Sequence, residues 1–285
     1  MELTHYRAGN PDASWWWVYT QYVEEYTPRS FTFDDDILDA FKGVMNSLSP
    51  RAGSFIWGLP ESAFDRSLVW YSALYNAGDP SRRRQQFPSW SWAGWRRNVP
   101  RDLGEGRDRV LYRRSIYACF WNFRFHAGVR WWICNPQTTY LSDLETADLR
   151  EVLRSEHAVE DGTWVHPKDI PEPRPPLTHF LCFITTLKHL TLVRHHVSGD
   201  LYELQDRGNE HVLGKIWLSP AVVEKHGLSL DFIVVGQEED PPTNYILMAI
   251  EWENGYAQRI ELVHEKVSWE DWFATKPEKR IINLA

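Results

Sequence analysis

The stretch at residues 87–95, Phe-Pro-Ser-Trp-Ser-Trp-Ala-Gly-Trp, constrains the fold more than any other part of the chain. In an extended segment, successive side chains point to opposite faces. We therefore expect a strand that places Trp90 and Trp92 in a deep apolar cleft and turns Ser89 and Ser91 toward a closely packed backbone. We call residues 87–95 the tryptophan seam, and we interpret it as a structural element that crosses between two parts of the protein.

The composition predicts an ordered protein with a large core. Of 285 residues, 43% are hydrophobic and 14% are aromatic, including 16 tryptophans, which favours a rigid core or a ligand-stacking surface over disorder. The three cysteines are widely spaced, and no Asn-x-Ser/Thr acceptor occurs, which indicates a reducing compartment. Because the N-terminus lacks the apolar run of a signal peptide, we expect a soluble, cytoplasmic protein.

Positive charge is concentrated in one window of an acidic chain. The net charge is -8, yet residues 82–114 hold ten arginines and only three acidic residues. Arginines interleaved with tryptophans are typical of surfaces that bind single-stranded nucleic acid. The alternative is that the guanidinium groups cover indoles through cation–π contacts. The candidate partner-binding residues are Arg82, Arg83, Arg84, Arg96 and Arg97.

The first part of the chain shows helical periodicity. Apolar residues recur at three- and four-residue steps over residues 12–26 and again over residues 37–48, after an acidic cluster at 34–36 that suits a helix N-terminus. Pro60 is well placed to begin a third helix. We therefore predict that residues 12–75 are mainly helical.

Beyond the seam the periodicity changes to two, which predicts strands. Asn254-Gly255 supplies the positive-φ turn of a tight hairpin. We also predict helices at residues 141–156, 219–227 and 268–274, and an exposed proline-rich crossing at 167–176. The predicted strands are 110–125, 129–134, 181–193, 202–204, 212–218, 232–237, 245–252, 256–263 and 280–284.

These elements predict an α+β fold. A helical subdomain at residues 1–80 would pack on a mainly antiparallel β domain at residues 81–285, arranged as a sandwich or barrel. The tryptophan seam would cross between them.

The sequence contains no recognisable catalytic motif. A nucleophile elbow, a P-loop and a His-Glu-x-x-His pair are absent, and Gly104-Glu-Gly106 lacks the third glycine of a dinucleotide loop. His179 with Cys182, or His195 with His196, could contribute metal ligands, but neither pair has zinc-type spacing. We therefore assign no catalytic, cofactor-binding or metal-binding residue.

A set of motifs resembles the region that follows the HET domain in filamentous-fungal heterokaryon-incompatibility proteins. The Pro-Ser-Trp-Ser-Trp motif is the most specific, and the closing residues 245–251, Asn254-Gly255, Ala257, Arg259 and Trp269 are similar to the end of the same proteins. The motif residues that we single out are Arg29, Asp36, Gly58, Trp70, Pro88, Ser89, Trp90, Ser91, Trp92 and Trp95.

The resemblance implies a function through the known role of the resembled proteins. It implies a non-enzymatic regulatory or interaction region in nonself recognition and cell death, with a protein partner or a HET module supplied in cis or in trans. The HET module would lie upstream of Trp15, and its signatures are not found here, so we expect a truncated product or a stand-alone relative. The alternatives are a nucleic-acid binder that uses residues 82–114 and a tryptophan-lined carbohydrate- or ligand-binding β module.

Overall fold

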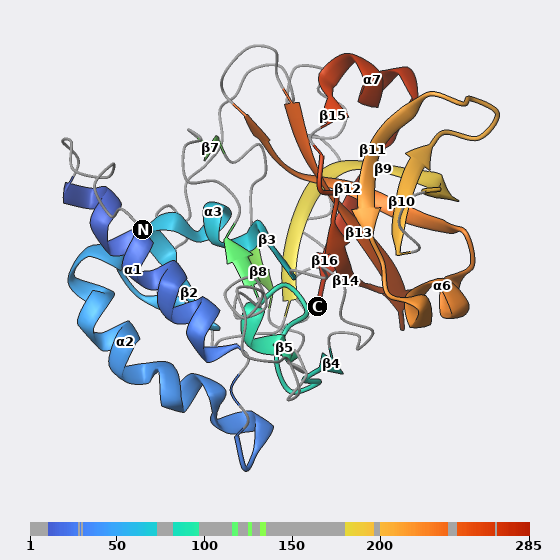
Figure 1. The fold of residues 1–285 in the computed structure, drawn as a ribbon. Helices are drawn as coiled ribbons and strands as arrows, with labels where there is room; N and C mark the ends of the chain where they lie inside the picture. Colours follow the sequence, from blue (N-terminus) through green and yellow to red (C-terminus); the bar gives the residue numbers. More distant parts are fainter. Residues whose placement is uncertain are drawn as a thin grey trace.

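The computed structural model describes residues 11–27, 29, 31–72, 82–96, 116–118, 125–126, 132–134, 180–196, 200–238, 244–265 and 267–285. Two helices lie on one side of the molecule and a large sheet lies on the other, with the seam region between them (Figure 1). This arrangement confirms the predicted α+β class. The helix and the proline-rich crossing predicted within residues 141–176 lie outside the described residues.

The two predicted N-terminal helices are present. They are α1 (Pro11–Tyr26) and α2 (Ile37–Ala52), and a 3₁₀ turn (Asp34–Asp36) precedes α2. Phe41 of α2 makes edge-on ring contacts with two tyrosines of α1, Tyr19 at 6.3 Å and Tyr26 at 5.1 Å between centroids. These aromatic contacts hold the helices together as a pair.

The prediction that residues 12–75 are mainly helical is wrong after α2. Gly53 and Gly58 have φ of +73° and +87°, values outside the helical region. The chain instead forms a short hairpin and a strand, and the third helix has only five residues. The elements are β1 (Phe55–Ile56), β2 (Leu59–Pro60), a 3₁₀ turn (Glu61–Ala63), α3 (Phe64–Leu68) and β3 (Trp70–Ser72).

The tryptophan seam is not a strand, which corrects the expected conformation. The Ser91 N–H donates to the Pro88 carbonyl in a first turn. The Gly94 N–H donates to the Ser91 carbonyl in the 3₁₀ turn (Trp92–Gly94) that follows. A Cβ at Gly94 would lie 2.4 Å from the Pro88 oxygen, so glycine is needed here for close approach rather than for a positive φ. The seam ends where β4 (Arg82–Arg83) pairs with β5 (Trp95–Arg96).

Within the described residues, ten strands form one mostly antiparallel sheet. Strand β6 (Ile116–Ala118) pairs separately with β3. The predicted helices at 219–227 and 268–274 are confirmed as α6 (Pro220–His226) and α7 (Trp269–Ala274). The strands of the sheet are β7 (Phe125–His126), β8 (Trp132–Cys134), β9 (Phe180–Arg194), β10 (Leu201–Gln205), β11 (Val212–Trp217), β12 (Ser229–Glu238), β13 (Asn244–Glu253), β14 (Tyr256–Leu262), β15 (Val267–Ser268) and β16 (Glu278–Leu284).

The long strand β9 bends the sheet back on itself. Residues 181–187 of β9 pair with β16, and residues 187–191 pair with β12. The sheet does not close into a barrel, because β14 and β16 share a single bridging pair, Ala257 with Leu284, and run parallel there. This leaves an opening between β14 and β16.

The β13–β14 hairpin confirms the strongest local signal in the sequence. Asn254 and Gly255 have φ of +52° and +85°, as a type I′ turn requires. The register then places Glu253 opposite Tyr256 and Trp252 opposite Ala257. The turn therefore determines which residues of β14 face the seam.

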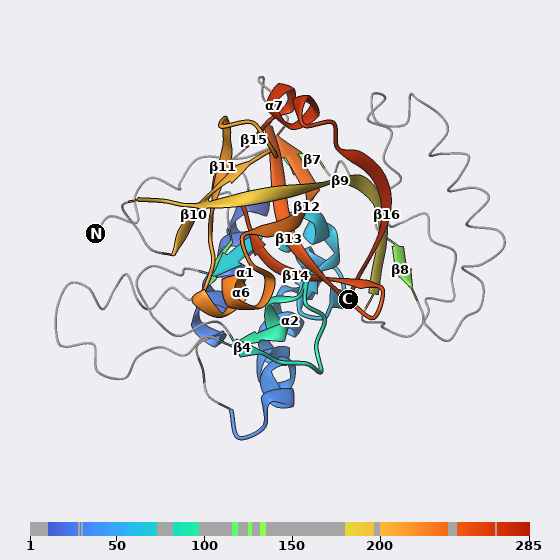
Figure 2. The same ribbon diagram turned by 90° about the vertical axis from the view of Figure 1, so that its right-hand side faces the viewer.

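Two hydrophobic cores lie on opposite faces of the sheet. The first joins side chains of α1 and α2, the seam, and strands β9, β12, β13, β14 and β16, so the helices and the sheet share it. In Figure 2 the strands of the sheet face the viewer and α1 and α2 lie behind them. The second lies beneath β10, β11 and α7 and includes the fully buried Trp272. The expected domain boundary at residue 80 stays a prediction, because the first core spans it.

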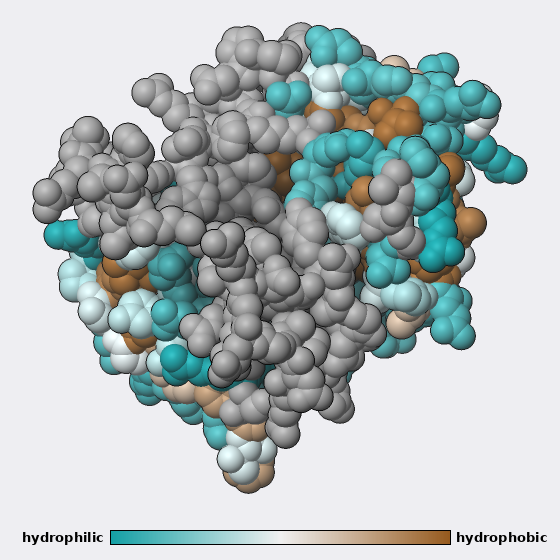
Figure 3. Space-filling view, in the orientation of Figure 1, coloured by the Kyte–Doolittle hydropathy of each residue, from teal (hydrophilic) through white to brown (hydrophobic). Residues whose placement is uncertain are grey.

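On the face of Figure 3, hydrophobic residues occupy small, separate areas of the described surface. No helix among the described residues is both long and apolar enough to cross a membrane.

We predict that the second core depends on one of the two tryptophans of α7. Trp272 is fully buried and its indole N–H donates to Thr186, whereas Trp269 is 47% exposed. Trp272→Ala should lower the free energy of unfolding by about 3–5 kcal/mol, and Trp269→Ala should change it by about 0.5 kcal/mol or less. Urea unfolding of both variants measures the difference, and equal losses would contradict the assignment of this core.

Candidate functional site

Ser89 joins the two strand edges that border the opening in the sheet. Its backbone N–H donates to the main-chain oxygen of Ala285, the residue after β16, at 2.9 Å, and its hydroxyl donates to the same oxygen. The hydroxyl oxygen also accepts the backbone N–H of Arg259 in β14 at 2.9 Å. Ser89 therefore provides the hydrogen bonds that a neighbouring strand would otherwise provide.

A second group of hydrogen bonds ties α1, the β1–β2 turn and the seam together. The Gly58 carbonyl accepts from the Tyr19 hydroxyl at 3.0 Å and from the Trp92 indole N–H at 3.3 Å. The Ser91 hydroxyl donates to the Trp57 carbonyl at 2.6 Å. A Cβ at Gly58 would lie 2.9 Å from the side chain of Leu38 and 3.0 Å from that of Trp92, so this position requires glycine for space as well as for φ.

The seam and the elements that it contacts, namely α1, the β1–β2 turn, α3, β3 and β14, form a region that we call the junction. Arg259 is the buried centre of the junction. Its guanidinium donates to the carbonyls of Leu68, at 2.8 Å, and of Trp70, and it lies 3.5 Å from the centroid of the Trp70 ring. The Trp70 indole N–H in turn donates to the Trp90 carbonyl at 3.0 Å. Glu261 provides the counter-charge 3.8 Å away. One side chain of the sheet thus fixes α3, β3 and the seam.

Arg83 holds the seam from one side. Its guanidinium donates to the carbonyls of Arg84 at 2.7 Å, Gly94 at 2.9 Å and Phe87 at 2.8 Å. It also lies 5.5 Å from the centroid of the Trp95 ring. These contacts match the alternative interpretation in which arginines cover indoles.

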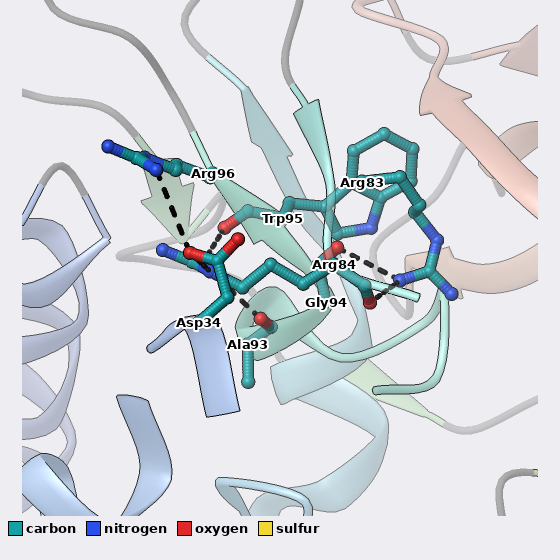
Figure 4. Close-up of polar contacts among 7 residues, drawn as sticks. All are labelled: Asp34, Arg83, Arg84, Ala93, Gly94, Trp95 and Arg96. Atoms are coloured by element: carbon teal, nitrogen blue, oxygen red, sulfur yellow. Dashed lines mark hydrogen bonds and ion pairs between the residues drawn. The ribbon is translucent and has the colours of Figure 1, made fainter. Parts of the chain in front are cut away.

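Arg84 holds the same turn from the opposite side, as Figure 4 shows. Its guanidinium donates to the carbonyls of Ala93, at 3.3 Å, and of Trp95. Its Nε lies 3.4 Å from Asp34 Oδ1, and an Arg96 guanidinium nitrogen lies 3.7 Å from the same oxygen. The acidic turn before α2 thereby meets the basic hairpin β4–β5.

Burial shifts the ionisation of these groups. It lowers the pKa of Arg259 to about 9 and that of Arg83 to about 10. It also lowers the pKa of Arg84, and it raises the pKa of Tyr19. The three guanidinium groups remain charged at neutral pH, so the junction holds buried positive charge that Glu261, Asp34 and the carbonyl dipoles stabilise.

The structure gathers most of the motif residues and leaves two at its edge. Trp90 and Trp92 are buried, as predicted, and Gly58, Trp70, Pro88, Ser89, Ser91 and Trp95 belong to the same junction. Arg29 is exposed and stacks on Tyr26 at 3.9 Å. Asp36 occupies the N-cap position of α2 but makes no side-chain capping hydrogen bond. The Arg82 side chain and all of Arg97 lie outside the described residues.

Sequence reasoning missed the buried role of Arg259 and the counter-charge role of Asp34. Arg259 belongs to the residues that carry the resemblance, but it lies in an alternating strand where an arginine ordinarily faces solvent. Its carbonyl acceptors lie 189 and 191 positions earlier in the chain. No local signal in the sequence could have found such a pairing.

The junction is built for packing. Most of the donors described for Arg83, Arg84, Arg259 and Ser89 are used on main-chain oxygens, while Arg84 Nη2 and Arg259 Nε have no hydrogen-bond partner among the described residues. Within the described residues, no group of three or more His, Cys, Asp or Glu side chains could hold a metal ion. His195 and His196 stack on each other at 4.7 Å, and His195 lies 3.7 Å from Glu203.

Compared with known proteins, the chain matches no family model, no curated protein and no solved structure.

We predict that Ser89 contributes more to stability than an ordinary serine hydroxyl. Ser89→Ala leaves the buried N–H of Arg259 without its acceptor, so the free energy of unfolding should fall by about 1–3 kcal/mol. Ser49→Ala is the matched control, because the Ser49 hydroxyl bonds its own helix at an exposed position, and it should change stability by about 0.5 kcal/mol or less. Thermal and urea unfolding of both variants test the prediction, which fails if the two losses are equal.

Proposed function

We propose that this chain is a non-enzymatic interaction region of a heterokaryon-incompatibility-type protein, acting in nonself recognition and cell-death signalling. One observation carries the proposal. Eight of the ten motif residues singled out from the resemblance, from Gly58 to Trp95, meet in one buried junction with Arg259. This gathering supports a common architecture with the resembled region, and the shared role is an argument by analogy from that architecture.

The engagement of the junction residues supports a structural rather than catalytic role for them. A general acid, base or nucleophile must reach a substrate atom within hydrogen-bond distance. The Ser89 hydroxyl instead bridges Arg259 and Ala285, and the Tyr19 hydroxyl bridges Gly58 and Trp92. We therefore propose that the chain acts by binding a protein partner in the cytoplasm, with a HET module in cis or in trans as the first candidate.

Two observations favour this proposal over the alternatives. The Arg83 guanidinium donates to three carbonyls of its own chain, which leaves fewer of its donors for the phosphates of a nucleic acid. Trp90 and Trp92 are almost completely buried, at 0% and 1% exposure, so neither offers a ring face on which a sugar or base could stack.

A mixing experiment tests the proposal. The purified chain should form a complex with a purified HET module from a fungal heterokaryon-incompatibility protein, measured by sedimentation velocity. The chain alone should leave NAD intact, because the residues of its junction are engaged in packing. Nicotinamide release by the chain above a heat-inactivated control, or the absence of any complex, would contradict the proposal.

The same preparation distinguishes the nucleic-acid alternative. Binding through phosphates weakens steeply with salt, by about 10³–10⁵ between 50 and 200 mM for a protein with six to ten phosphate contacts. We expect no saturable binding of a single-stranded oligonucleotide at ~150 mM salt. Tight, salt-dependent binding that Arg83→Ala abolishes would favour the alternative.

A further inference from the structure

Arg84 has a buried donor that the fold does not use. Its side chain is 0% exposed, and its Nη2 has no hydrogen-bond partner in the part of the chain that the structure describes. The Nε and Nη1 groups, by contrast, reach Asp34 and the carbonyls of Ala93 and Trp95. An unpaired donor on a buried cation is costly, so an acceptor oxygen at this position would be strongly stabilised.

Asp34 and Arg96, the charged groups beside Arg84, lie nearer to solvent than Arg84 does. Asp34 Oδ1 is 3.4 Å from Arg84 Nε and 3.7 Å from Arg96 Nη1, whereas a charge-assisted hydrogen bond between a guanidinium and a carboxylate is about 2.8 Å. The side chains of Asp34 and Arg96 are 36% and 24% exposed. Figure 4 shows the Asp34 carboxylate reaching both guanidinium groups on the same side of the β4–β5 hairpin.

We propose that Arg84, Arg96 and Asp34 form a binding site for inorganic hydrogenphosphate. The two guanidinium groups donate to the phosphate oxygens, including the donors of Arg84 Nη2 that have no partner within the fold. The trio carries a net charge of one positive unit, which favours an anion. Asp34 is an acceptor, and it selects an anion that still carries a proton to donate to it.

This arrangement discriminates between anions of the same shape. Inorganic phosphate keeps at least one P–OH group at neutral pH, whereas sulfate and the phosphodiester of a nucleic acid carry none and would repel the Asp34 carboxylate. A phosphate monoester, with a second pKa near ~6, is mostly without that proton at pH 7.5. The site is therefore distinct from a nucleic-acid surface, and it does not depend on the proposed partner of the chain.

The experiment compares phosphate with sulfate at equal ionic strength. Isothermal titration of the full chain at pH 7.5 uses inorganic phosphate, sulfate, phosphoserine and a single-stranded oligonucleotide as separate probes. We expect phosphate to bind about tenfold or more tightly than sulfate, because a site that needs a ligand proton rejects analogues without one. Phosphoserine should bind more weakly than phosphate, and the oligonucleotide should not compete with phosphate.

Two variants and a matched control identify the residues. Asp34→Asn removes the acceptor charge and supplies an amide donor, so sulfate should then bind within about twofold of phosphate. Asp35→Asn makes the same change on the exposed neighbouring residue and should keep the wild-type preference. Arg96→Gln should weaken phosphate binding about tenfold, in line with loss of one charge-assisted contact. Arg84 itself is left unchanged because it also holds the seam.

Three results would overturn the proposal. The first is no saturable phosphate binding, which would assign the Arg84 donors to ordinary hydration. The second is equal affinity for phosphate and sulfate in the wild-type chain, because general attraction between opposite charges would then explain the binding without selection by Asp34. The third is a phosphate preference that Asp34→Asn does not change, because Asp34 would then have no part in selecting the anion.

Discussion

Buried hydrogen-bond donors hold the tryptophan seam in the opening of the sheet, and the rest of the structure depends on them. Ser89 connects β14 to the residue after β16 at the point where these strands stop pairing. Arg259 reaches out of β14 to the carbonyls of α3 and β3. Removing either side chain would leave buried backbone groups without hydrogen-bond partners, which would lower the free energy of unfolding. The seam is therefore the part of the chain through which the helices and the sheet share one core.

Elements with local signals could be predicted from the sequence. The aromatic periodicity of α1, the acidic turn before α2 and the Asn254-Gly255 turn each depend on residues a few positions apart. Strands β9 and β13 were predicted close to their observed bounds because long apolar runs leave few alternatives. The burial of Trp90 and Trp92 followed from their size.

Features that depend on distant partners could not be predicted. The alternation of Trp90, Ser91 and Trp92 is typical of a strand, but the serine hydroxyls cap turns and bridge remote carbonyls instead. The arginine-rich window indicated a surface for a partner, yet the guanidinium groups of Arg83 and Arg84 donate to backbone carbonyls of the compact turn. The sequence shows where the arginines lie along the chain, but only the fold determines which carbonyl groups accept their hydrogen bonds.

The central claim is that the seam couples the helical part and the sheet into one cooperative unit. Native-state hydrogen exchange of the full chain tests this most directly. The claim predicts that the slowest amides of α1 and α2 open with the same free energy and the same denaturant dependence as the slowest amides of β9 and β16. Exchange of the α1 and α2 amides through a separate opening, several kcal/mol below that of the sheet, would contradict it.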